Sequence, residues 1–192
     1  MNNKFNDVVI TAALRTPIGT YKGSLKNLSA DKLGTFVIKE VIKKSKLKVD
    51  DIDEIIMGQV LTSGSGQNPA RQAAIHSGIP VSKPSYTVNQ VCGSGLKSIV
   101  LAYQSIKLGE NKIIVSGGQE NMSKAPHALF FRENKKFSED KLFDTMINDG
   151  LIDAFNNYHM GITAENVAKK YKISRNEQDL FALHSQEKTQ KA

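Results

Sequence analysis

The chain has 192 residues, of which 40% are hydrophobic and 23% charged. This composition is typical of a globular protein with one good core, and it excludes a disordered or fibrous chain. The net charge is +7, but the basic residues form no stripe and do not alternate with aromatic residues. The favoured explanation of this charge is a solvated surface of scattered basic residues, and attraction to an anionic metabolite is the alternative. Binding to nucleic acid is the weakest explanation.

Residues 1–7 are polar and lack the apolar stretch of a secretion signal. No later apolar run approaches the roughly 20 residues of a membrane helix. We therefore expect a soluble, cytoplasmic protein without a membrane partner. The apolar run at residues 8–14, which begins with β-branched residues, predicts a buried strand. Residues 15–29 contain Pro and Gly and predict a loop, after which Ser29 caps a helix that ends near Lys46.

The middle of the chain alternates between strand and helix patterns. Strands are predicted within residues 51–61 and at 86–91 and 112–116, with a short helix after Pro69 and a longer one at 96–108. Asn68 and Gly78 bound the short helix. One face of the longer helix carries its large apolar residues, Leu96, Ile99, Val100, Tyr103 and Ile106. This order predicts an α/β layer with parallel strands and crossover helices.

The pattern changes after Glu120. Residues 121–159 show no clean period, and their aromatic residues argue against disorder; these are Phe130, Phe131, Phe137, Phe143, Phe155 and Tyr158. We expect a long ordered excursion over the core. Helices are predicted at 163–171 and 174–192, the second with a capping box formed by Ser174 and Glu177. The sequence stops inside that helix without a cap, which predicts a truncated chain.

Cys92 is the only cysteine, so no disulfide holds the fold, as expected in a reducing compartment. In VNQVCGSG a strand leads to a tight turn, and a helix follows. The positive end of that helix favours the thiolate, which is the nucleophilic form of cysteine. Gly93, Ser94 and Gly95 would keep the approach open, and the backbone N–H groups of the turn could bind an oxyanion. The alternative is a buried core cysteine, because free cysteine is among the most buried residue types. A cysteine nucleophile also needs a base, which this segment does not supply.

The histidines give a weaker signal. His76 and His184 lie on predicted helices and His127 in a loop, and none has metal-ligand spacing, so no metal site is predicted. His159, followed by Met160, ends the aromatic segment, although plain packing also explains this pair. The glycine-rich segments TSGSGQN and VSGGQEN match neither a P-loop nor a dinucleotide fingerprint and are interpreted as turns.

Several segments together are similar to one known family. They are VVITAALRTPIGTYKGSL, GQVLTSGSGQNPARQAA, VNQVCGSGLKS, IIVSGGQENMS and YHMGITAENVAKKYKISRNEQDLFALHSQEK. In this order they resemble the thiolases, from about residue 7 to the last residue, and most closely the short-chain acetoacetyl-CoA enzymes. The resemblance implies the N-terminal half of the layered thiolase fold, with a mixed sheet and flanking helices. Residues 1–120 would form this α/β half and 121–192 part of the loop domain.

The resemblance also implies a function and its residues. Cys92 would accept an acyl group, and its own N–H would contribute to an oxyanion hole. Leu151 would lie near the coenzyme A tail, and His159 and Met160 would border the acyl and pantetheine pocket. The reaction would condense two acetyl-CoA molecules into acetoacetyl-CoA and CoA, or run in reverse. Coenzyme A thioesters would be substrates, with no cofactor and no metal.

The same resemblance marks what the sequence lacks. The second half of a thiolase supplies an activating histidine, a second catalytic cysteine and an asparagine that helps hold a catalytic water, and this sequence contains none of these. The alternatives are therefore an inactive thiolase fragment and, within the enzyme class, a longer-chain 3-ketoacyl-CoA thiolase. The full-length family enzymes form homo-oligomers, but residues 127–137 depart from the usual tetramer loop. A half-fold would also expose an apolar face and aggregate or need a partner.

Overall fold

The computed structural model describes residues 7–132 and 142–191. The chain divides into two compact units, residues 1–150 and 151–192. The predicted domains, 1–120 and 121–192, refer to the family's architecture and stay a prediction. The first unit contains α1 (Ala30–Ser45), β1 (Glu54–Gly58), α2 (Pro69–His76), β2 (Ser85–Val88), α3 (Ser94–Leu108), β3 (Ile114–Gly118), β4 (His127–Ala128) and β5 (Phe143–Asp144). Short helical turns lie at Val49–Asp51 and Met122–Lys124 in the first unit, and a third, Ile147–Leu151, crosses the boundary between the units. The second unit contains α4 (Met160–Tyr171) and α5 (Arg175–Lys191).

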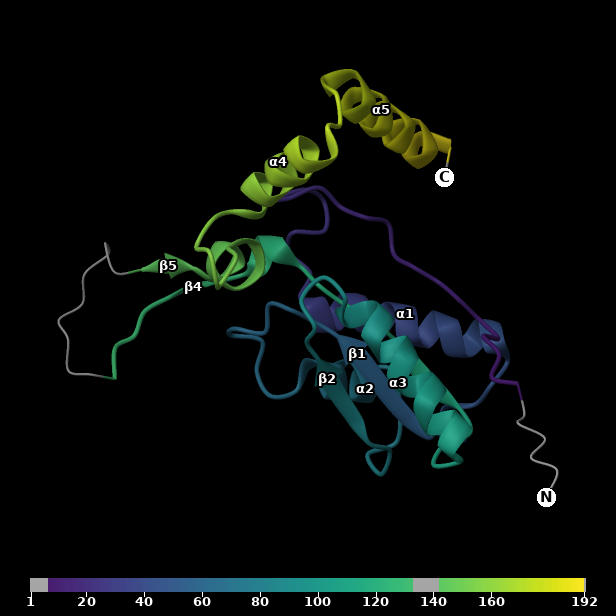
Figure 1. Ribbon diagram of the computed structural model, residues 1–192. Helices are drawn as coiled ribbons and strands as arrows, with labels where there is room; N and C mark the ends of the chain where they lie inside the picture. The colour runs from purple at the N-terminus through teal and green to yellow at the C-terminus, as the bar shows by residue number, and fades with distance from the viewer. Residues whose placement is uncertain (1–6, 133–141, 192) are drawn as a thin grey trace. The chain divides into compact units, whose positions relative to one another are not determined.

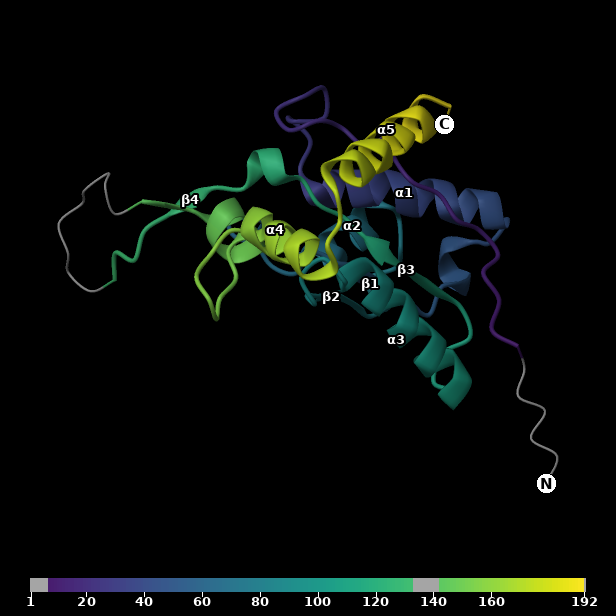
Figure 2. The same ribbon diagram turned by 45° about the horizontal axis from the view of Figure 1, so that its top comes forward.

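Three parallel strands form the central sheet in the order β2-β1-β3. Helix α2 packs on one face, against β1 and β2, and α1 covers α2, while α3 packs on the opposite face, against β1 and β3 (Figure 1). Figure 2 shows these layers in sequence, with the strands between α3 and the pair α1–α2. The order follows from strand–helix–strand crossovers on both sides of β1. The predicted α/β architecture with parallel strands and flanking helices is confirmed.

The core lies between β1 and the pair of helices α1 and α2. Because side chains alternate across a strand, Ile55 and Met57 of β1 face these helices, while Ile56 and Gly58 face α3. The core cluster consists of Ile38, Ile42, Ile52, Ile55, Met57, Ala70, Ala73, Ala74, Ile79 and Val115. The alanines of α2 allow this helix to approach the strand closely.

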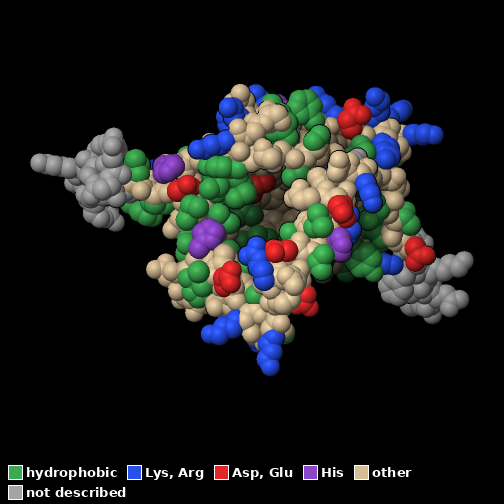
Figure 3. Space-filling view, turned by 90° about the horizontal axis from the view of Figure 1, so that it is seen from above, with side chains coloured by type: hydrophobic (Ala, Val, Ile, Leu, Met, Phe, Trp, Pro, Cys, Tyr) green, Lys and Arg blue, Asp and Glu red, His purple; other side chains and the backbone are tan. Residues whose placement is uncertain are grey.

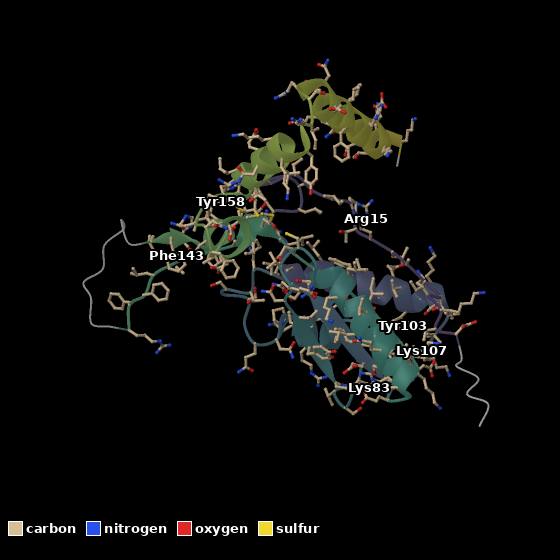
Figure 4. The ribbon with its side chains drawn as sticks, viewed as in Figure 1. Arg15, Lys83, Tyr103, Lys107, Phe143 and Tyr158 are labelled. Carbon is tan, nitrogen blue, oxygen red and sulfur yellow. The ribbon has the colours of Figure 1, made fainter. Side chains whose placement is uncertain are left out.

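Helix α3 packs on the sheet through small residues. Its buried residues are Ser94, Ser98 and Ala102, and the Ser98 hydroxyl donates to the Gly117 carbonyl at 2.8 Å. The predicted apolar face does form, but it points away from the sheet: Leu96 is 69% exposed. Figure 4 labels two residues of this helix, Tyr103 and Lys107, whose ammonium lies 5.8 Å from the Tyr103 ring.

The strand predicted at residues 8–14 is wrong. This segment is irregular, and Val9 and Ile10 are 70% and 75% exposed. Within the described residues it pairs with no strand. A β-branched run forms a strand only where a neighbour offers backbone hydrogen bonds and a surface to pack on, and this run has neither. In contrast, the predicted strands near 51–61, 86–91 and 112–116 are present as β1, β2 and β3, shifted by one to three residues.

Polar and aromatic side chains organise the rest of the chain. Phe130 stacks on Phe143, with ring centroids 5.3 Å apart, beside the β4–β5 ladder. Phe155 is 97% exposed, and Phe137 lies outside the described residues.

No helix in the described ranges is both long and apolar enough to cross a membrane. Figure 3 shows Lys and Arg side chains scattered over the visible face, as the dispersed basic residues of the sequence predict.

The second unit begins its helices with side-chain caps. The Ser174 hydroxyl accepts from the Glu177 N–H, and the Glu177 carboxylate accepts from the Ser174 N–H at 2.7 Å, so the predicted capping box is confirmed. Helix α4 starts at Met160, three residues before the predicted start, because His159 caps it: the imidazole Nδ1 accepts from the Gly161 N–H at 3.0 Å.

Candidate functional site

Polar residues follow each of the three parallel strands at their carboxyl ends. Gln59 follows β1, Asn89 follows β2, and Gln119 and Glu120 follow β3. Cys92 lies three residues beyond Asn89, before α3 begins. In open α/β sheets this edge is where ligands bind. The sheet therefore places the only cysteine of the chain beside a row of polar groups.

Cys92 is exposed, so the alternative of a buried core cysteine is wrong. The residue before it, Val91, has a φ of 49°, which is left-handed backbone. Gly93, the residue after it, is the N-cap of α3, a helix of 15 residues. The thiol thus stands at the positive end of this helix, whose partial charge favours an anion there.

The turn uses its own N–H groups. The Gly93 N–H donates to the Gln90 carbonyl at 3.0 Å, and the Ser94 N–H donates to the Val91 carbonyl at 3.1 Å. Neither of these two groups is free to bind an oxyanion, so the expectation is wrong for them, and for the Cys92 N–H it stays a prediction. Tight turns satisfy their N–H groups internally because an unpaired donor is costly.

The glycines near Cys92 serve close packing more than access. An added Cβ at Gly58 would lie 2.5 Å from the Ser94 carbonyl carbon and 2.6 Å from the Gly95 nitrogen. Gly95 in turn lies against Gly118. The start of α3 therefore rests directly on the ends of β1 and β3. Ser94 is buried and Gly95 faces the sheet, so their small size serves packing, and the expectation that Gly93, Ser94 and Gly95 keep an approach to Cys92 open stays a prediction.

A buried polar network connects the ends of β1 and β3. The Gln119 amide donates to Gln59 Oε1 at 3.0 Å, and the Gln59 amide donates to the Leu61 carbonyl at 2.9 Å. Glu120 Oε2 accepts from the N–H groups of Val60 and Leu61, at 2.8 and 3.3 Å. Its other oxygen, Oε1, is buried without a hydrogen-bond partner among the described residues. Burial raises the pKa of Glu120, and the backbone donors lower it less.

This raised pKa predicts a pH dependence of stability. The folded chain holds the Glu120 proton more tightly than the unfolded chain, so the free energy of unfolding falls as pH rises from 4.5 through the raised pKa. Glu120→Gln keeps an acceptor for Val60 and removes the titration. We expect the stability of the parent relative to Glu120→Gln to decrease across this window in urea titrations. Glu40→Gln, at an exposed carboxylate of α1, is the control, and a constant difference for Glu120→Gln would contradict the prediction.

The other three predicted site residues lie in the second unit. Leu151 precedes a loop that closes on itself: the Asp153 N–H donates to the Tyr158 carbonyl at 2.9 Å, and Ile152 forms an antiparallel bridge with His159. The loop therefore brings Leu151 together with His159 and Met160. Since Nδ1 of His159 is an acceptor, a neutral imidazole carries its proton on Nε2. Cys92 belongs to the first unit.

The described residues hold no group of three His, Cys, Asp or Glu side chains that could bind a metal ion. His127 instead lies near one carboxylate, Asp144, with Nε2 4.0 Å from Oδ2. The segment TSGSGQN is closed by Gln72, whose amide donates to the Ser65 and Gln67 carbonyls, both at 2.8 Å. This loop is the turn that its glycines predict.

The sequence interpretation does not identify the roles of Asn89 and Glu120, just after strands, or of Ser94, the first residue of α3. For Asn89 and Glu120 the available signal is positional, because polar residues that follow a buried parallel strand lie at the sheet's binding edge. The sequence predicts Ser94 only as a small residue, whereas its hydroxyl is hydrogen-bonded within the Cys92 turn.

Residues 8–192 match the family model of the thiolase N-terminal domain. The chain is 54% identical over 187 residues to acetyl-CoA acetyltransferase of Cupriavidus necator, covering 97% of this chain and 48% of that protein. It is 55% identical over 183 residues to the enzyme of that name from Pseudomonas aeruginosa, with 95% and 47% covered. It is 50% identical over 192 residues to the cytosolic acetyl-CoA acetyltransferase of Rattus norvegicus, with 100% and 48% covered. The chain spans about half the length of these curated relatives.

Proposed function

We propose that this chain, which belongs to the thiolase family and matches the N-terminal domain of that family, forms the acyl-accepting half of an acyl-CoA acyltransferase. In this proposal Cys92 is the nucleophile. The observation that carries this proposal is the exposed Cys92 thiol directly before the first turn of α3, at the carboxyl edge of a parallel sheet. A thiolate is the nucleophilic form of cysteine, and a helix N-terminus favours it.

The proposed reaction has two steps. The Cys92 sulfur attacks the carbonyl carbon of acetyl-CoA, the carbon–sulfur bond to coenzyme A breaks, and coenzyme A leaves as a thiol with the proton. A second acetyl-CoA then loses an α-proton to a base, which by family resemblance the second half of a thiolase supplies. The resulting enolate attacks the thioester on Cys92, a carbon–carbon bond forms, and Cys92 is released with acetoacetyl-CoA as a thiolate that takes up that proton. In the reverse direction coenzyme A cleaves acetoacetyl-CoA. Coenzyme A thioesters are the substrates, and we propose no cofactor.

We assign substrate contacts to the second unit by family resemblance. Leu151 would contact the coenzyme A tail, and His159 and Met160 the acyl and pantetheine group. Two features support this assignment: the bridge between Ile152 and His159 gathers the three residues, and the Nε2 proton of a neutral His159 is available to a carbonyl oxygen because Nδ1 is already bonded. The N–H of Cys92 would contribute to the oxyanion hole.

Acetyl transfer to the chain is tested by labelling. The 192-residue protein is incubated with [1-¹⁴C]acetyl-CoA, quenched in acid and digested with pepsin, and the labelled peptide is sequenced. We expect one labelled peptide, which contains Cys92, and loss of the label with neutral hydroxylamine, as a thioester requires. Label on another residue, or no label after long incubation, would refute the assignment of Cys92.

A second measurement separates the alternatives. The chain is fused to the C-terminal half of the P. aeruginosa relative, and thiolysis is measured with acetoacetyl-CoA and with 3-ketooctanoyl-CoA. Preference for acetoacetyl-CoA supports the short-chain function, and preference for the longer substrate supports a 3-ketoacyl-CoA thiolase. Labelling of the chain without turnover of the fusion identifies an inactive fragment.

A further inference from the structure

We propose that Asn89 and Ser94 are positioning residues, which hold Val91 in its left-handed conformation and so orient the thiol of Cys92. The inference rests on the proposed function only in treating Cys92 as the nucleophile. The hydrogen bonds around Val91 carry the structural part of the argument by themselves.

Val91 is an unfavourable residue for its backbone conformation. Its φ of 49° places a β-branched side chain in the left-handed region, where the Cβ atom crowds the backbone. Such strain persists only when surrounding contacts impose it. Val91 is 50% exposed, so packing of its side chain provides only part of those contacts. Contacts to the backbone around Val91 supply the rest.

Two side chains bind the backbone on both sides of Val91. Asn89 Oδ1 accepts from the Val91 N–H at 2.9 Å, and the Asn89 amide donates to the Val60 carbonyl at 3.3 Å, which ties it to the segment after β1. The Ser94 hydroxyl donates to the Val91 carbonyl at 2.6 Å and accepts from the Gln90 N–H at 2.8 Å. Ser94 is 4% exposed, so water does not compete for these bonds. We call this set of bonds the elbow clamp.

The elbow clamp acts directly on the residue before the nucleophile. Without it, Val91 is expected to return to a negative φ, because the extended and right-handed regions cost a valine less. That rotation would change the direction of the following Cα–Cβ bond, which carries the Cys92 sulfur. The thiol would then leave its place at the start of α3, where the helix favours the thiolate. The clamp therefore couples a backbone conformation to the position of the thiol relative to the start of α3.

The test uses the rate of Cys92 alkylation by iodoacetamide, measured from pH 6 to 10 on the 192-residue chain. The ratio of the alkylation rate at pH 7 to that at pH 10 should be about fivefold lower in Asn89→Ala than in the parent chain. The reason is that a displaced thiol no longer lies at the positive end of α3. Asn89→Ser keeps a side-chain acceptor for the Val91 N–H without adding a charge near the thiol, and it should restore part of the rate. A merely structural role would not change the shape of this pH profile.

Val91→Gly provides the decisive background, since glycine adopts positive φ without strain and needs no clamp. The parent profile should persist in Val91→Gly, and Asn89→Ala should then change the pH 7 rate less than about twofold. Equal loss with and without Val91→Gly would overturn the proposal, as would an unchanged profile in a folded Asn89→Ala chain. If Asn89→Ala alone does not fold, the two Val91→Gly chains still test the proposal, because a loss of more than about twofold caused by Asn89→Ala on that background would overturn it. Iodoacetamide needs no coenzyme A, so failed acetyl labelling with an intact coupling would refute the proposed function alone.

Discussion

Gly58→Ala is expected to destabilise the first unit by about 3 kcal/mol or more, because its Cβ would overlap backbone atoms rather than a movable side chain. The new carbon would lie 2.5 Å from the Ser94 carbonyl carbon and 2.7 Å from the Ser94 carbonyl oxygen. Relief requires α3 to move away from β1, which also opens the contact between Gly95 and Gly118. Urea unfolding followed by circular dichroism measures the change.

Gly95→Ala is the matched control for this prediction. Gly95 belongs to the same contact, but its added Cβ would meet nothing closer than the Gly118 Cα at 3.9 Å, which is an ordinary contact. Alanine in a helix is favoured over glycine by up to about 1 kcal/mol, so Gly95→Ala should be neutral or stabilising. Equal destabilisation by both variants would show that the backbone contact at Gly58 is not the cause.

Cys92→Ser is expected to lower thiolysis of acetoacetyl-CoA at least about 10⁴-fold in the fusion with the P. aeruginosa half, as loss of a nucleophile does in other enzymes whose residues act as a unit. A serine hydroxyl is not ionised at neutral pH, so it attacks a thioester far more slowly than a thiolate does. The variant should bind substrate yet form no acyl intermediate. Initial rates and acid-quench labelling measure both effects.

The stability of the Cys92→Ser chain serves as its control. Cys92 is exposed, and substitutions at exposed sites usually change stability by less than about 0.5 kcal/mol. A melting curve that matches the parent would assign the lost activity to chemistry rather than to unfolding. Turnover near the parent rate in Cys92→Ser would refute the assignment of Cys92 as nucleophile.

Local rules were sufficient for the ends of several helices. For α2 they identified Asn68, which accepts from the Arg71 N–H at 3.1 Å, Pro69 at the first position, and Gly78, with a φ of 95°. A cap is a contact between residues three apart in the chain, so the sequence contains the whole interaction. The alternation of strands and helices predicted the parallel sheet for a similar reason, because short crossovers leave few possible topologies.

The errors concern contacts between distant residues. Residues 8–14 have strand composition but pair with no strand within residues 7–132 and 142–191, and nothing local reveals that. The apolar side of α3 was identified, yet Ser98 and Ala102 face the sheet instead. At the site, the sequence identified Cys92 but not the role of Asn89, because that role depends on a positive φ at Val91, a residue type that argues against such a turn. The packing role of Gly58 likewise depends on a segment more than thirty residues away.

The outward apolar side of α3, where Leu96 and Leu108 are largely exposed, has a thermodynamic consequence. A molecule that binds this side of the native chain but does not bind the unfolded chain raises the free energy of unfolding by RT ln(1 + [L]/Kd). Here [L] is the free concentration of that molecule and Kd its dissociation constant. The midpoint of thermal unfolding then depends on mass action. A melting temperature of this protein is meaningful only together with its concentration and the other solutes present.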